Sequence, residues 1–201
     1  MTSWDPAEAE HVTSAAQLRE IVEPPHPEIA EKVVSGIDGV SRGFIERSRL
    51  FLVATTGADG RLDVSPRGDT ARSVVVFDDG KTLAYAERPG NRRVDGLHNI
   101  LENPQVGMLF MIPGVTHVLR VNGTATVVRS APFMADLAVK GTPPELAVVV
   151  TVEELFVHCG RALLKSGLWR PHTWPEGDHP GVMALFESQQ ALKTDPPRTT
   201  P

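Results

Sequence analysis

The sequence predicts a mainly β domain of the α+β class, in which an antiparallel, closed or nearly closed barrel carries flanking helices. Short runs of strand-forming residues recur at near-regular spacing between residues 50 and 157. Tight turns rich in Gly and Asp, such as 57–60 and 78–80, separate several of them. Few helical patterns interrupt this series. Regularly spaced strands with tight turns are typical of barrels and sandwiches.

Residues 1–48 are expected to form a helical segment packed on the barrel. Residues 13–22 begin with a hydroxyl side chain that can cap a helix, and their apolar residues recur at helical spacing. Three prolines between 24 and 27 then break the chain, and Ile29, Val33 and Val34 predict a second helical face. Residues 41–48 predict a third helix.

Residues 49–170 are expected to form the barrel domain. The expected strands are 50–56, 61–65, 73–77, 81–87, 105–112, 117–128 and 147–157. The expected helices are 91–102, with Val94, Leu97 and Leu101 on one face, 131–139 and 159–166. Residues 171–201, rich in Pro and Gly, are expected to form a wrapping arm or a loosely ordered tail.

Composition excludes several classes of partner. The net charge of −5 and pI of 5.8 give no long-range attraction to nucleic acid or to an anionic membrane surface. The apolar stretches are far shorter than a membrane-spanning helix needs. We therefore expect neither a nucleic-acid nor a membrane partner.

The expected compartment is the cytoplasm. Cys159 is the single cysteine, so no intrachain disulfide can form, and the acidic first residues do not resemble a secretory signal. His158 beside Cys159 suggests a nucleophile and its base, but neighbouring residues of a strand point to opposite faces. We therefore expect Cys159 to be a buried structural thiol instead.

The central arginines predict a site for a small anion. Arg61, Arg67, Arg72, Arg88, Arg92 and Arg93 occur within a short window. In the segment 88–93, RPGNRR, the arginines stand between an expected strand and an expected helix, where unpaired N–H groups favour a phosphate. The alternative is a solvated turn whose arginines pair with nearby acids such as Asp95.

Two further segments are candidates for binding a ligand. In the segment 63–69, DVSPRGD, which includes Ser65, Pro66, Arg67 and Gly68, proline indicates a sheet edge or a bulge, with backbone groups free for a flat heterocycle; a polar hairpin connection is the alternative. In CGRALLKSGLWRP, Arg161 and Lys165 share a helix face and Trp169 could cover an aromatic ring; core packing of the leucines is the alternative.

Metal and common nucleotide motifs are missing from the sequence. The seven histidines are dispersed, and neither HExxH nor CxxC occurs, so we expect no metal site. GxGxxG and GxxxxGK[ST] are absent as well.

The order of these segments resembles that of a known family. LFLVATT, SPRGD, TLAYAE, RPGNRRVDGLHNILENPQVGMLF, LRVNGTA and HCGRALLKSGLW together are similar to the pyridoxamine 5′-phosphate oxidase-like FMN-binding proteins. The similarity is greatest to an uncharacterised branch with a PGNRR-type junction and a Cys-x-x-Ala-Leu-x-x-Ser-x-Leu-Trp segment. It covers roughly residues 37–171, and residues 91–123 are its most specific part.

The resemblance implies an FMN-binding split barrel that forms a homodimer with FMN at the interface. It implies that Arg92 and Arg93, with Asn91 beside them, hold the FMN phosphate. It also implies that Ser65, Pro66, Arg67 and Gly68 line the isoalloxazine edge, and that Lys165, Ser166 and Trp169 come from the partner subunit. The arginine and histidine pattern with which pyridoxamine phosphate oxidases hold their substrate does not occur in the tail.

The expected function is an FMN-dependent oxidoreductase acting on an unidentified small molecule. Arg67 is the expected positive charge near the pyrimidine end of the flavin, and no residue is assigned as an obligatory acid or base. Two alternatives stay open: a flavin-binding or sensing module without turnover, and a split barrel that binds haem or a deazaflavin.

Overall fold

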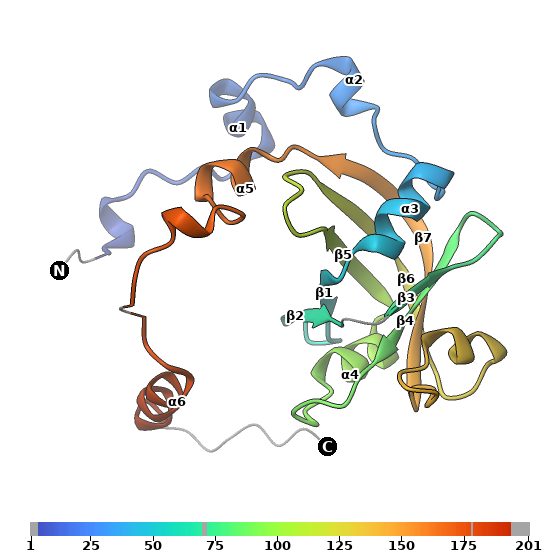
Figure 1. The fold of residues 1–201 in the computed structure, drawn as a ribbon. Helices are drawn as coiled ribbons and strands as arrows, with labels where there is room; N and C mark the ends of the chain where they lie inside the picture. The colour runs from blue at the N-terminus through green and yellow to red at the C-terminus, as the bar shows by residue number, and fades with distance from the viewer. Residues whose placement is uncertain (1–3, 70–71, 178, 194–201) are drawn as a thin grey trace.

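A seven-stranded antiparallel sheet forms the body of the protein, as seen in a computed structural model that describes residues 4–69, 72–177 and 179–193. Its strands are β1 (Leu50–Thr56), β2 (Leu62–Gly68), β3 (Val74–Val76), β4 (Thr82–Glu87), β5 (Gln105–Met111), β6 (Val118–Val128) and β7 (Leu146–His158), in the spatial order β2-β1-β5-β6-β7-β4-β3. The sheet curls on itself, which confirms the predicted split barrel (Figure 1).

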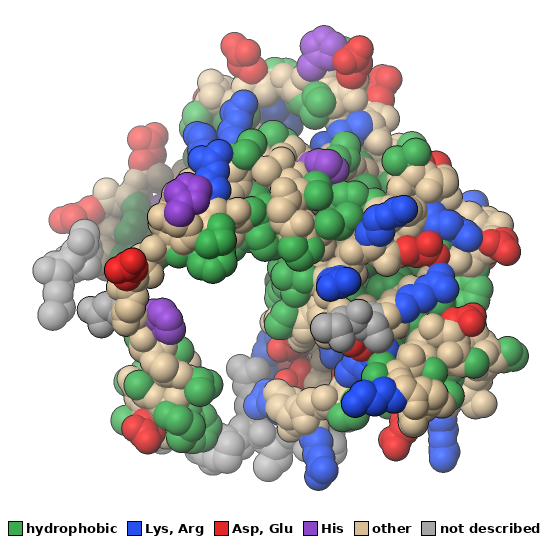
Figure 2. Space-filling model, in the orientation of Figure 1, with side chains coloured by type: hydrophobic (Ala, Val, Ile, Leu, Met, Phe, Trp, Pro, Cys, Tyr) green, Lys and Arg blue, Asp and Glu red, His purple; other side chains and the backbone are tan. Residues whose placement is uncertain are grey.

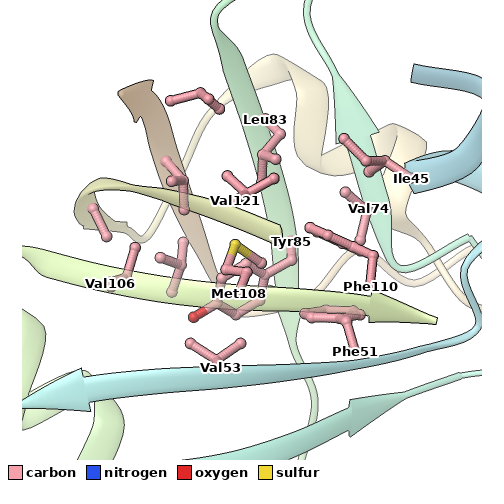
Figure 3. Packing of buried hydrophobic residues seen from close by; sticks show 14 of the residues in the cluster. Ile45, Phe51, Val53, Val74, Leu83, Tyr85, Val106, Met108, Phe110 and Val121 are labelled. Carbon is pink, nitrogen blue, oxygen red and sulfur yellow. The ribbon is translucent and has the colours of Figure 1, made fainter. Parts of the chain in front are cut away.

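The inner face of the curled sheet holds the main hydrophobic core. Burial alternates along β1, so that Phe51 and Val53 point inward while their neighbours are half-buried. The Phe51 ring lies 5.2 Å from that of Phe110 and 5.6 Å from that of Tyr85, and Figure 3 shows these rings meeting beside Met108. Each such buried side chain stabilises the fold by about 1.5–3 kcal/mol.

Three helical elements pack on the barrel. Helix α3 (Gly39–Arg47) buries Ile45 against β3. The 3-10 turn η2 (Pro132–Leu137) buries Met134 and Leu137 against the outer side of β3 and β4. Helix α4 (Asp95–Glu102) packs on β1 and β6 through Leu97 and Ile100. The prediction of a helical segment at 131–139 is thus met by a shorter, tighter turn.

The terminal segments lie outside this core. Among them are η1 (Pro6–Glu8), α1 (Ala15–Ile21), α2 (Pro27–Ala30), α5 (Arg161–Ser166), η3 (Pro171–Thr173) and α6 (Val182–Ala191), and none contains a buried residue. In Figures 1 and 2 the arm that carries α6 is separated from the barrel by an open gap. Helix α6 is not predicted from the sequence, and the end of the predicted tail, 194–201, lies outside the described residues.

Two predicted helices differ from the observed ones. The second helix is a single turn, because Val34 leaves it to form a β-bridge with Leu155. Helix α4 begins at Asp95 rather than at residue 91, and its buried residues are Leu97 and Ile100, whereas Leu101 is 73% exposed.

Cys159 is exposed, so the prediction of a buried structural thiol is wrong. It lies just beyond the end of β7, where the chain leaves the sheet, so the alternation of inward and outward residues along the strand no longer applies to it. Among the described helices, none has the length and apolarity needed to cross a membrane.

Candidate functional site

Strand β2, which carries Ser65-Pro66-Arg67-Gly68, is the outermost strand at one end of the sheet. This confirms the prediction that Pro66 stands at an edge, where its missing N–H costs no ladder hydrogen bond. Side chains alternate along the strand. Ser65 and Arg67 are half-buried, whereas Pro66 and Gly68 are exposed on the other face. The four predicted residues therefore do not present one common surface.

Arg67 lies beside the strand that leads into residues 88–93, here called the arginine loop. Its Nη1 donates to Oε1 of Glu87, the last residue of β4, over 2.7 Å, and both side chains are largely buried. Directly next to this pair, Arg88 Nε donates to Asp69 Oδ2 over 2.8 Å. A Cβ placed on Gly96 would lie 4.0 Å from Arg67 Nη2, so the guanidinium is close to the first turn of α4. The edge-strand segment around Arg67 and the arginine segment 88–93, which were predicted separately, thus lie next to each other.

Helix α4 is fixed to the two strands beneath it by one amide. Asn99 Nδ2 donates to Thr55 Oγ1 over 2.9 Å and to Asp63 Oδ2 over 2.8 Å. Because Thr55 is buried in β1 and Asp63 belongs to β2, this contact sets the distance between the start of the helix and the edge strand.

The arginine loop itself is an open turn. Asn91 Oδ1 accepts from the Arg93 N–H over 3.0 Å, and Arg92 and Val94 have φ of 63° and 49°, in the left-handed region. A side-chain-to-backbone turn of this kind competes with helix formation, which is why α4 starts only at Asp95. No side chain caps the helix, and the N–H groups of Leu97 and His98 donate to the Val94 carbonyl, so only the N–H groups ahead of Leu97 lack a backbone partner in the helix.

The two predicted phosphate ligands differ in their surroundings. Arg93 Nε donates to Asp95 Oδ2 over 2.7 Å, and this hydrogen bond and charge raise the pKa of Arg93 above its usual range. Arg93 therefore matches the alternative named above, a solvated turn in which an arginine pairs with Asp95. Arg92 is exposed, with no partner among the described residues, and Asn91 is exposed beside it.

Tyr85 links the core to the Arg67–Glu87 pair. Burial raises the pKa of Tyr85 far above its ordinary value. The positive charge of Arg67 opposes this shift, and the negative charge of Glu87 adds a smaller contribution to it. Its hydroxyl therefore stays protonated across the physiological range. Two atoms of the pair itself, Arg67 Nε and Glu87 Oε2, are buried without a hydrogen-bond partner in the described part of the chain.

Lys165, Ser166 and Trp169 lie elsewhere. The first two are exposed on α5, with Ser166 Oγ donating to the carbonyl of Leu163, and Trp169 Nε1 donates to the carbonyl of Val115 over 2.9 Å. In Figure 1, α5 and α4 lie at opposite ends of the barrel. A single chain does not bring these residues together with the arginine loop.

Several residues of this region were not predicted as site residues. Glu87 and Asn99 are positioned by strand closure, and no local pattern identifies them. Asp69 ends the predicted segment 63–69, but the sequence assigns it no role. Arg72 belongs to the arginine-rich window of the sequence and, with Arg47 and Arg49, lines a cavity of about 460 Å³ between the end of α3 and the start of β3. Figure 2 shows basic side chains distributed over this face of the barrel.

Comparison with known proteins gives a family match. The profile of the family described as pyridoxamine 5′-phosphate oxidase matches residues 37–159, more than half of the chain. No curated protein matches the sequence.

Solved structures similar to this chain have low sequence identity. HupZ from Group A Streptococcus is 23% identical, with a TM-score of 0.47 over 60% of this chain and 93% of that one. A Clostridium acetobutylicum protein related to general stress protein 26 is 18% identical, with a TM-score of 0.43 over 59% and 85%. HutZ, the haem storage protein from Vibrio cholerae, is 14% identical, with a TM-score of 0.40 over 61% and 94%. The match to the family profile, which spans β1 to β7, decides the assignment: this chain belongs to the pyridoxamine 5′-phosphate oxidase family.

Proposed function

We propose that this protein binds FMN and acts as an FMN-dependent oxidoreductase on a small molecule. One observation carries the proposal: the two segments that the sequence singles out for phosphate and ring binding converge at Arg67, Glu87 and the start of α4. Both segments lie within the part of the chain that matches the family. When bound, the flavin would supply the electron-transfer chemistry, and the protein would supply binding and orientation.

The arginine loop has the donor set that a phosphate group needs. Arg92 is exposed and unpaired among the described residues, and the uncapped first turn of α4 adds N–H groups at its positive end. Arg92 would therefore be the principal ligand of the FMN phosphate. Arg93 would contribute as a second guanidinium that Asp95 already orients, and Asn91 fixes the shape of the turn.

The edge strand suits the flat ring system of the cofactor. Ser65 and Arg67 face the interior side of β2, so they would meet the isoalloxazine edge through their side chains. Pro66 and Gly68 face the other way and would contribute through the backbone. Glu87 balances the charge of Arg67, so the field at the ring would be that of an ion pair rather than that of a free guanidinium.

The proposed assembly is a homodimer with FMN between its subunits. Lys165, Ser166 and Trp169 lie at the opposite end of the barrel from α4, so only a second copy of the chain could bring them to the flavin. We also propose a cytoplasmic location, because the exposed thiol of Cys159 suits a reducing compartment.

The chromophore provides the first test of this proposal. The freshly purified, untagged protein should show a flavin absorbance spectrum, and heat release should yield a compound with the mass of FMN. The spectrum and mass of a haem or a deazaflavin would contradict the cofactor assignment.

Turnover is tested separately on the flavin-loaded protein. Anaerobic addition of NADH or NADPH should bleach the flavin, and candidate acceptors should restore its absorbance. If neither nucleotide nor any acceptor changes the spectrum, the protein is a flavin-binding or sensing module, and the oxidoreductase assignment fails.

A further inference from the structure

The split of the barrel is closed by side chains rather than by backbone hydrogen bonds. In the described sheet β2 pairs only with β1, and β4 pairs with β3 and β7, so no ladder joins β2 to β4. Four strands separate these two in the sheet order. The Arg67–Glu87 and Arg88–Asp69 ion pairs nevertheless connect them, over 2.7 and 2.8 Å.

The two ion pairs have opposite polarity. Residues 67 and 69 on the β2 side are positive and negative, and residues 87 and 88 on the β4 side are negative and positive. Any other pairing across the split would place Arg67 against Arg88 and Asp69 against Glu87. Repulsion between like charges in a partly buried setting disfavours that pairing. The four charges therefore specify one register between strands that share no hydrogen-bonded ladder in the described sheet.

Burial makes these pairs more consequential than surface salt bridges. The side chains of Arg67, Glu87, Arg88 and Asp69 are 22%, 14%, 24% and 16% exposed. Removing one partner would leave a charge in a setting that already holds two unpartnered polar atoms, Arg67 Nε and Glu87 Oε2. Such a loss is costly, whereas an exposed pair usually contributes little.

We propose that Glu87 and Asp69 are positioning residues of the cofactor site. With Arg67 and Arg88 they form a four-charge latch that holds the edge strand against the arginine loop and so assembles the site before any ligand binds. This role deepens the proposed function and rests on it where FMN is concerned. The closure of the split itself is independent of the identity of the ligand.

The latch is tested first in the flavin-free protein. Glu87→Gln keeps the shape of the side chain and removes its charge. We expect amide hydrogen exchange in β2 to accelerate about tenfold or more, with β6 and β7 unchanged. Glu46→Gln is the matched control, because it breaks an Arg–Glu pair of the same 2.7 Å length, Arg72–Glu46, which joins α3 to the segment before β3. Unchanged exchange in β2 would overturn the latch.

A charge exchange tests the positioning role directly. Asp69→Arg and Arg88→Asp should each raise β2 exchange, and the two together should restore at least half of the lost protection, because the ion pair is re-formed with reversed polarity. Effects that simply add would show that the two residues act separately, which would refute a latch.

Flavin binding provides the second readout. Glu87→Gln should weaken FMN binding about tenfold or more, and the exchanged pair should recover it together with β2 protection. If the flavin-free variants show the exchange effects, but neither they nor the wild type bind FMN, the latch stands and the proposed cofactor fails. Loss of FMN binding without any change in β2 exchange would overturn the positioning role.

Discussion

At the scale of single residues, the site depends on which arginines are already engaged. Arg67, Arg88 and Arg93 each have an acidic partner within 2.8 Å, whereas Arg92 has none among the described residues. A guanidinium without an internal partner gains a full charge-assisted hydrogen bond when a phosphate arrives, while a paired one exchanges one bond for another. Adjacent residues of identical type therefore have different expected roles.

Substitution of Arg92 tests this difference. Arg92→Ala should weaken FMN binding by about 1.5–3 kcal/mol, roughly a ten- to hundredfold rise in Kd, and Arg93→Ala should cost less. Quenching of flavin fluorescence during titration of the flavin-free protein measures both. Arg129→Ala, at an exposed arginine just past the end of β6, is the control. Equal affinities for all three variants and the wild type would contradict the phosphate assignment.

Gly123 gives a residue-scale prediction about the sheet. It lies at the register shift between β6 and β7, and an added Cβ would overlap the carbonyl oxygen of Thr151. Because a backbone atom cannot yield as a flexible side chain does, Gly123→Ala should destabilise the fold by about 3 kcal/mol. Chemical denaturation measures the change. Gly39→Ala, with nothing within 4 Å of its Cβ, should be close to neutral, and equal stabilities would refute the clash.

At the scale of elements, the strands were predictable and the starts of the helices were not. Alternation along LFLVATT and the turn residues around it fix β1 through local chemistry alone. The start of α4 depends on the Asn91 turn and on Val94 in a left-handed conformation, which β-branched residues rarely adopt. Glu87 could not be identified as a site residue, and Asp69, which ends the predicted segment 63–69, could not be assigned a partner, because the ion pairs face each other only after the sheet has curled.

Helix α3 offers a prediction about acid stability. Its N-cap, Asp38, accepts hydrogen bonds from the backbone of Val40 and Ser41 and from the Ser41 hydroxyl, and these bonds, chiefly that from the hydroxyl, lower the pKa of Asp38 below its ordinary 3.8. A lowered carboxyl pKa contributes stability above the ordinary pKa, and this contribution disappears as the pH falls through the lowered value. Asp38→Ala should cost about 1 kcal/mol at neutral pH.

Asp38→Asn separates the charge from the cap. Asparagine caps helices well but does not titrate, so its stability relative to the wild type should improve as the pH drops below about 4. Thermal unfolding followed by circular dichroism between pH 6 and pH 3 measures this difference. If the difference in melting temperature between the wild type and Asp38→Asn stays constant with pH, the Asp38 charge has no role in stability.

At the scale of the whole molecule, β7 holds the barrel together. It pairs with β6 along eleven positions and with β4 along six, and Ala147, Val148 and Val150 are fully buried. Past Trp169, which contacts Val115, none of the described residues up to 193 is buried. The barrel and the C-terminal arm are therefore unequal in their importance for folding.

Two truncations test this inequality. A chain ending at residue 170 should keep a cooperative thermal transition within a few degrees of the full chain. A chain ending at residue 146 should lose it, because β4 and β6 would lose their shared neighbour. Circular dichroism melting curves compare the three. A large drop in the melting temperature of the chain that ends at residue 170 would show that the arm stabilises the fold, for example by packing on a second copy of the chain.

The position of the ion pairs in the sheet order has a consequence for when the proposed flavin site forms. Leu50 pairs with Met111 and Thr82 with Thr151, so the ladders that lead from β2 to β4 join distant parts of the sequence and form slowly. Arg67 and Glu87 are only 20 residues apart in the chain, but the curled sheet that buries their ion pair is complete only once these ladders are in place. A nascent or half-folded chain thus lacks the buried part of the proposed site, and a yellow colour would report that folding has run to completion.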